Sequence, residues 1–248
     1  MPIKYLSIIL SLIFILSLAA CKDLPDDSSS GEVNKPTSSI PYSSNSVSSE
    51  EPKYKPDLNS WELKLVNKWN SLDEEFEPPL EKISSKYTAR TDYFFDSRAI
   101  ENLYDLLDAS KEAGVKLTII SPYRTKSTQT RLFNNQVTRE LNNNKNLTRE
   151  QAEIRAATAV ARPRTSEHEL GLAVDFNSVE ENFEDTKEFK WLKENAHKYG
   201  FIMRYPKENQ DLTAVIYEPW HYRYVGIENA LEIKNSGLCL EEFLSQYK

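Results

Sequence analysis

The sequence predicts an α+β domain with a small, largely antiparallel sheet flanked by helices, placed after a signal peptide and a flexible tether. Three observations predict this arrangement. Amphipathic stretches of helical period are interspersed with short alternating runs, no regular βα rhythm connects them, and both begin only near Asn59. The 248-residue chain leaves enough length after that point for one well-filled core.

The N-terminus resembles a lipoprotein signal peptide over residues 1–20. It has a basic start at Lys4, an apolar stretch over 5–18 and small residues before Cys21. LAAC, residues 18–21, resembles the lipobox of bacterial lipoproteins, which implies cleavage before Cys21 and a lipid on its sulfur. An ordinary signal peptide or an uncleaved anchor is the alternative. A lipid would hold the protein to the outer face of the cell membrane.

Residues 21–58 are expected to form the tether, and residues 59–248 one folded domain. Serine, proline and small polar residues dominate the tether, and nothing in it recurs at a helix or strand period. Such a composition does not bury enough apolar surface to offset the loss of chain entropy.

The cysteine content and the net charge argue against a disulfide-stabilised fold and against a nucleic-acid-binding protein. If Cys21 carries lipid, Cys239 has no disulfide partner, so the fold must be stabilised by its own core or by a metal. The formal charge of −7, without any run of lysine and arginine, argues against a nucleic-acid partner. No sequence feature specifies an oligomeric state, and we expect a monomer.

Helical periodicity and capping residues predict five helices. Trp61, Leu65, Trp69 and Leu72 would share one face of the first, and Thr148 with Gln151 would cap the fourth. The predicted helices span 61–72, 96–114 (with Asp96 as N-cap), 127–143, 148–161 and 186–200.

Strand signals are fewer and shorter. In GLAVDF, Leu172, Val174 and Phe176 fall on one face, and Ala173 and Asp175 on the other. The predicted strands lie within 115–121, 171–176, 201–206 and 213–226.

Two of the three histidines and one aspartate form a candidate metal site. His168 belongs to a loop, His221 lies among aromatic residues, and Asp175 requires a matching cation if it is buried. His197, near the end of a polar helix, is expected to be structural or solvated. Two imidazoles and a carboxylate suit Zn²⁺ and leave a fourth position for water, although a turn followed by a paired aspartate is the simpler alternative.

Glu218 strengthens the prediction of a catalytic site. It precedes His221 by three residues, and Pro219 between them makes a straight strand unfavourable. A bend there would place Glu218 and His221 around one cavity, where a carboxylate can take a proton from water and pass it to a leaving amine. The alternative is that Glu218 pairs with Arg223 or with another surface cation.

Four segments together resemble the VanY-type D-alanyl-D-alanine carboxypeptidases, in the LAS group of zinc peptidases. SEHELGLAVDF matches their Ser-x-His-x(6)-Asp signature, and EPWHYRYVG their Glu-x-x-His signature. SPYRTKSTQTRLF is similar to their Tyr-Arg segment, and LVNKWNSLDEEFEPPL to the start of their domain. The resemblance extends from about Leu63 to Gly226.

The resemblance implies a role for each matching residue. It implies zinc bound by His168, Asp175 and His221, and Glu218 as general base and then general acid. Arg124 would bind the terminal carboxylate or the developing oxyanion of the substrate. Further contacts with the substrate are implied for Ser166, Gln129, Tyr123 and Trp220. Relatives often have glycine where Pro122 and Arg164 stand here.

The expected function is therefore a zinc carboxypeptidase that removes the terminal D-alanine from peptidoglycan stem peptides, with D,D or L,D specificity. The same site would also suit an endopeptidase that cuts cross-links. A lipoprotein that binds cell-wall peptides without cutting them is the alternative from another class, although mere binding does not require Glu218.

Overall fold

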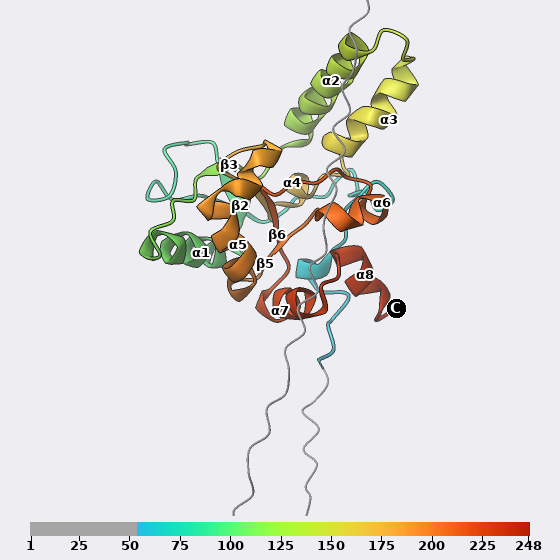
Figure 1. Cartoon of the computed structure of the whole chain (residues 1–248). Helices are drawn as coiled ribbons and strands as arrows, with labels where there is room; N and C mark the ends of the chain where they lie inside the picture. Colours follow the sequence, from blue (N-terminus) through green and yellow to red (C-terminus); the bar gives the residue numbers. More distant parts are fainter. Residues whose placement is uncertain (1–53) are drawn as a thin grey trace, which may run out of the picture. The chain divides into compact units, whose positions relative to one another are not determined.

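The computed structural model describes residues 54–248, and Figure 1 shows the arrangement of their helices and strands. The predicted signal peptide, Cys21 and most of the predicted tether lie outside these residues. Tyr54 and Leu58 pack against a buried apolar cluster, so the folded part begins earlier than Asn59. No helix within the described range is long and apolar enough to span a membrane.

The four-stranded sheet is antiparallel throughout, as the sequence predicted. Its strands run in the order β3-β4-β6-β5, and a two-stranded hairpin of β1 and β2 lies apart from it. The strands are β1 (Leu80–Lys82), β2 (Phe94–Asp96), β3 (Ile119–Ser121), β4 (Ala173–Phe176), β5 (Phe201–Met203) and β6 (His221–Tyr224).

The described residues also form eight α-helices and four short 3₁₀ turns. The α-helices are α1 (Ile100–Glu112), α2 (Lys126–Asn143), α3 (Arg149–Ala159), α4 (Glu167–Leu170), α5 (Lys187–Asn195), α6 (Gln210–Thr213), α7 (Ile227–Ser236) and α8 (Leu240–Ser245). The 3₁₀ turns are η1 (Trp61–Leu63), η2 (Glu181–Asp185), η3 (Ala196–Tyr199) and η4 (Lys207–Asn209).

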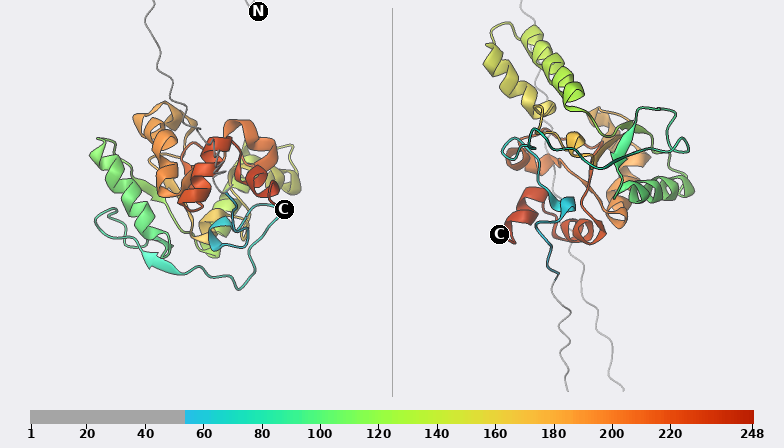
Figure 2. Two further views of the ribbon diagram at one scale, coloured as in Figure 1. Left: turned by 90° about the horizontal axis from the view of Figure 1, so that it is seen from below. Right: turned by 180° about the vertical axis from the view of Figure 1, so that it is seen from behind.

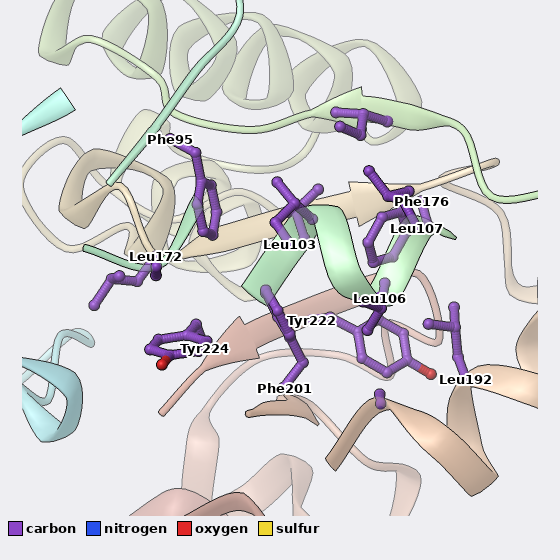
Figure 3. Packing of buried hydrophobic residues seen from close by; sticks show 14 of the residues in the cluster. Phe95, Leu103, Leu106, Leu107, Leu172, Phe176, Leu192, Phe201, Tyr222 and Tyr224 are labelled. Carbon is purple, nitrogen blue, oxygen red and sulfur yellow. The ribbon is translucent and has the colours of Figure 1, made fainter. Parts of the chain in front are cut away.

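One face of the sheet carries the main hydrophobic core. Leu103 and Leu106 of α1 belong to this core together with Phe176 of β4 and Tyr222 of β6, whose rings lie 5.9 Å apart between centroids (Figure 3). The alternation predicted for 171–176 is present, because Leu172, Val174 and Phe176 all belong to this core. Asp175 and His221 therefore lie on the opposite face of β4 and β6.

Helices α2 and α3 form an antiparallel hairpin that extends away from the sheet (Figures 1 and 2). The hairpin has a small core of its own, made of Phe133, Val137, Ala152 and Ala156. The predicted cap of α3 is confirmed: Gln151 N donates to Thr148 Oγ1, and Thr148 N donates to Gln151 Oε1.

The helix predicted over 61–72 is wrong beyond its first turn. Only Trp61–Leu63 are helical, and Trp69 is 59% exposed instead of facing a core. The side chain of Asn67 is the reason, because its Oδ1 accepts from Trp69 N, Asn70 N and Asn70 Nδ2. An asparagine that binds nearby amide groups in this way competes with helical hydrogen bonding.

Two further boundaries differ from the predictions. Asp96 ends β2 and does not cap α1, which begins at Ile100 after Ala99. The last predicted strand is regular only from His221, because the chain at 214–220 is irregular up to the bend at Pro219.

Candidate metal centre

The register of the sheet places Asp175 and His221 side by side. They are direct partners in the antiparallel pairing of β4 with β6, and both are buried. His221 Nδ1 lies 3.0 Å from Asp175 Oδ1. Two residues that are 46 positions apart in the sequence thus share one point on the sheet.

His168 reaches the same point from α4, a single helical turn where the sequence predicted a loop. Gly171 ends the turn with a φ of +81°, a left-handed conformation that returns the chain into β4. His168 Nδ1 lies 2.8 Å from the backbone oxygen of Pro122, which favours a proton on Nδ1 and a lone pair on Nε2. That Nε2 atom lies 3.3 Å from Asp175 Oδ2.

The three side chains form a donor set that fits a metal ion, since one potential ligand atom from each lies within 4.8 Å of the others. Burial and the Arg124 charge lower the pKa of His168 to about 4, so this imidazole is neutral at pH 7, as a ligand must be. Burial also opposes charge on His221, but Asp175 and Glu167 outweigh it and raise the His221 pKa to about 9. The surroundings of His221 therefore favour a positive charge. A bound metal cation can supply that charge in place of the proton on the imidazole.

Glu218 lies beside this cluster because the chain turns at Pro219 before β6 begins. His221 N donates to the backbone oxygen of Glu218 at 3.2 Å, and Glu218 Oε2 lies 3.7 Å from His221 Nδ1. Burial raises the pKa of Glu218 to about 8, with His221 opposing the rise and Asp175 adding to it. A bound divalent cation would lower this value. Such a carboxyl suits proton transfer near neutral pH.

Arg124 lines the same cleft, of about 610 Å³, as the three predicted ligands and Glu218. Its Nε donates to Ser121 Oγ at 2.8 Å, and its Nη2 donates to Asp175 Oδ2 at 2.7 Å. Its Nη1 has only a long contact, 3.5 Å, with Gln129 Oε1. Nη1 is therefore the donor group best placed to meet an anionic ligand.

The other predicted contact residues divide into two groups. Ser166 and Trp220 line the cleft, and Trp220 also packs into the main core. Tyr123 lines a neighbouring cleft instead. Gln129 is fully buried and donates from Nε2 to the backbone oxygen of Ala161 at 2.7 Å, so it ties α2 to the segment after α3.

Glu167, which the sequence reasoning missed, lies behind His221. Its Oε2 is 3.6 Å from His221 Nε2, and neither atom has a hydrogen-bond partner among the described residues. Its Oε1 accepts from Arg204 Nε and Arg223 Nη1, both at 2.8 Å. Arg204 also bonds both carboxylate oxygens of Glu241 in α8. A carboxylate held this rigidly favours a proton on His221 Nε2, which leaves Nδ1 as the ligand atom.

A signal for this arrangement was present in the sequence. His221 and Arg223 are two positions apart in a strand, so they lie on one face, and a buried arginine there requires a carboxylate. Arg223 indeed pairs with Glu167 and not with Glu218, the alternative that the sequence left open. Glu167 adjoins His168 within the same short motif.

Arg164 and Pro122, the two positions at which the sequence departs from the family pattern, lie in different surroundings. Arg164 has a φ of +68°, a left-handed conformation that favours glycine. Its side chain lies away from the cleft, with Nη2 donating to the backbone oxygen of Phe76 and Nη1 3.9 Å from Glu169 Oε1. Pro122 contributes its backbone oxygen to His168. His197 lies in η3 and lines no part of the cleft.

A buried set of two imidazoles and one carboxylate, with a second carboxyl suited to proton transfer beside it, defines the class of a metal-dependent hydrolase. Residues 93–227 match VanY, the D-alanyl-D-alanine carboxypeptidase family. The chain belongs to this family.

Similarity to known proteins extends well beyond the matched motifs. A D-alanyl-D-alanine carboxypeptidase of Enterococcus faecalis is 41% identical over 192 residues, which cover 77% of this chain and 69% of that protein. The structure of a vancomycin-resistance D,D-pentapeptidase VanY mutant in complex with Zn(II) is 41% identical and has a TM-score of 0.65, over 75% of this chain and 99% of that one. The LD-carboxypeptidase LdcB is 36% identical, with a TM-score of 0.64, over 74% and 86% of the two chains.

Proposed function

We propose that this protein is a zinc-dependent carboxypeptidase that removes the terminal D-alanine from peptidoglycan stem peptides. The observation that carries the proposal is one buried cleft containing the cluster of His168, Asp175 and His221 together with Glu218 and Arg124. The relatives named above, one of them in complex with Zn(II), support both the reaction and the metal.

His168 Nε2, a carboxylate oxygen of Asp175 and His221 Nδ1 would hold the zinc ion. Bound zinc supplies a Lewis acid that polarises a substrate carbonyl and makes water easier to deprotonate. The Pro122 backbone oxygen, 2.8 Å from His168 Nδ1, favours the tautomer that this requires of His168, and the Glu167 carboxylate, 3.6 Å from His221 Nε2, favours a proton on that nitrogen of His221.

Glu218 would carry the proton. Its carboxylate accepts a proton from the attacking water as the water oxygen bonds to the scissile carbonyl carbon. The same proton then passes to the amino group of the departing D-alanine as the carbon–nitrogen bond breaks. The carboxyl lies 3.7 Å from His221, at the edge of the metal-ligand cluster, which is the place from which both transfers can occur.

Arg124 would hold the end of the substrate. Its guanidinium is oriented by Ser121 and Asp175, and Nη1 remains available for the terminal carboxylate or the developing oxyanion. Ser166 lines the same cleft and would contribute a hydroxyl to the peptide terminus. A carboxylate held there selects a chain end over an internal bond.

Replacing Glu218 by glutamine tests the mechanism. Glu218→Gln should lower kcat for D-alanine release from a pentapeptide by roughly 10²–10⁴-fold, the usual contribution of acid–base catalysis, while bound zinc is unchanged. Glu194→Gln, which alters an exposed carboxylate on α5 that does not line the cleft, is the control and should be fully active. Full activity of the Glu218→Gln protein with its zinc retained would exclude this role, and assays on tetrapeptide separate D,D from L,D specificity.

We further propose that the protein acts as a monomer anchored by lipid at Cys21 on the outer face of the cell membrane, with the residues between Cys21 and the folded part, which begins by Tyr54, as its tether. The LAAC sequence at 18–21 supports this anchor. The expected result is a mature chain that starts at Cys21 and fractionates with membranes, and a Cys21→Ala protein that does not. Retention of the Cys21→Ala protein in the membrane fraction through an uncleaved N-terminus would contradict the proposal.

A further inference from the structure

A second cleft, of about 700 Å³, adjoins the one that holds the predicted zinc ligands. The two clefts share four lining residues: Ala161, Tyr205, Val215 and Ile216. The Tyr205 ring, in this shared wall, lies 4.9 Å from the His221 ring between centroids. The two clefts therefore lie on either side of one wall, and a substrate that leaves the zinc-ligand cluster over that wall would reach the second cleft.

Trp69 lines this second cleft and stands on a loop whose backbone is fixed by hydrogen bonds. Its side chain is 59% exposed, which is unusual for so large an apolar group. The backbone around it is nevertheless fixed, because the buried Asn67 binds Trp69 N and Asn70 N and donates from Nδ2 to Glu241 Oε1 at 3.0 Å. The Lys68 ammonium lies over one face of the indole, 4.2 Å from its centroid, so a ligand would stack on the opposite face. An exposed indole on a fixed loop is preorganised for binding.

The rest of the cleft combines apolar surface with polar groups. Ile154, on the α3 side, is also 59% exposed, and the chain at 210–216 forms the facing wall. Thr158, Arg162 and Asp211 add hydrogen-bonding groups to the lining. A flat aromatic face with donors and acceptors around it matches a pyranose ring, which has an apolar C–H face and hydroxyl groups at its edge.

We propose that this second cleft binds the sugar to which the stem peptide is attached, with Trp69 stacked on the sugar ring. The inference rests on the proposed function, because that function defines the substrate. The side chains of a stem peptide are small or charged, so none of them offers an apolar face for an indole. Its N-terminal end is joined to a glycan, and a few extended residues, at about 3.3 Å each, separate that glycan from the scissile bond.

The test compares two substrates with the full-length protein: a pentapeptide joined to its N-acetylglucosamine–N-acetylmuramic acid disaccharide, and the same pentapeptide without sugar. Trp69→Ala should lower kcat/KM for the sugar-linked substrate about tenfold, the loss of one stacking contact, and change that for the free peptide less than twofold. Trp69→Phe, which keeps a flat apolar ring, should lose less. Leu231→Ala, at an exposed residue of α7 that lines neither cleft, should change neither value.

Equal losses on both substrates would show that the cleft binds peptide and would overturn the inference, as would no loss on either. Calorimetric binding of both substrates to Glu218→Gln and to Glu218→Gln/Trp69→Ala separates this inference from the proposed reaction. If the unaltered protein cuts neither substrate but Trp69→Ala still weakens binding of the sugar-linked one selectively, the reaction is wrong and the sugar site stands. If binding shows no such selectivity, the sugar site is wrong.

Discussion

At the scale of single residues, the site depends on which nitrogen of each imidazole carries its proton. Pro122 and Glu167 determine this in different ways, one through a backbone oxygen at 2.8 Å and the other through a carboxylate at 3.6 Å. The Pro122 oxygen remains whatever side chain stands there, whereas the Glu167 contact can be removed by a single substitution. Substitution of Glu167 therefore measures how much a residue outside the ligand set contributes to zinc affinity.

Glu167→Gln should weaken zinc binding 10–100-fold, because the amide is neutral and no longer raises the basicity of His221. Chelator competition measures the zinc affinity directly. The control is Glu241→Gln, which disturbs the same buried Arg204 but has no contact with His221. If both variants lose zinc affinity equally, Glu167 acts only by supporting the fold.

How far the site could be predicted differs from residue to residue. His168, Asp175, His221 and Glu218 stand in two short motifs, and the structure brings all four together in one cleft. Gln129 could not be placed, because only packing decides that its side chain turns toward Ala161.

At the scale of elements, a helix was predicted correctly where a capping pattern and a helical period of apolar residues occurred together. The α3 helix begins after Thr148 as predicted, whereas Ser60, before the stretch 61–72, makes no side-chain cap hydrogen bond and the helical period there was misleading. There, the local hydrogen bonds of Asn67 outweighed a weak helical pattern. The β1–β2 hairpin was missed because its three-residue strands are too short to show a period.

The α2–α3 hairpin depends on its cap more than a helix in the main core does, because its own core is small. Thr148→Ala should lower the free energy of unfolding by about 1 kcal/mol, through loss of the hydrogen bond to Gln151 N. Urea unfolding followed by circular dichroism measures this change. Thr148→Ser keeps the hydroxyl and should change stability far less, and equal losses in the two variants would argue against the cap.

At the scale of the whole molecule, one buried charge network connects distant parts of the chain. Arg223 donates to the backbone oxygens of Glu62 and Lys64, and Arg204 joins Glu167 to Glu241 in α8. The beginning and the end of the described chain thus meet behind the metal-ligand cluster. Breaking one partner of such a buried network leaves an uncompensated charge, so each member is required.

The network predicts how stability depends on pH. Burial alone would raise the pKa of Glu241, but the Arg204 charge outweighs it and the pKa lies below its usual 4.5. Its stabilisation is therefore present above pH 4.5 and lost as the pH falls through the lower value in the folded protein. The difference in unfolding free energy between the unaltered protein and Glu241→Gln, measured with chelator present, should shrink below pH 4.5. A difference that stays constant down to pH 3 would contradict this account.

The most direct test of the central claim is D-alanine release from a pentapeptide by the purified protein, measured with its zinc content before chelation, after chelation and after zinc is restored. We expect one zinc ion per chain, loss of D-alanine release when the metal is removed, and recovery when one equivalent of zinc is restored. We also expect that His168→Ala and His221→Ala each abolish this recovery. Full release of D-alanine by the metal-free protein would show that the cluster of His168, Asp175 and His221 is not the catalytic metal site.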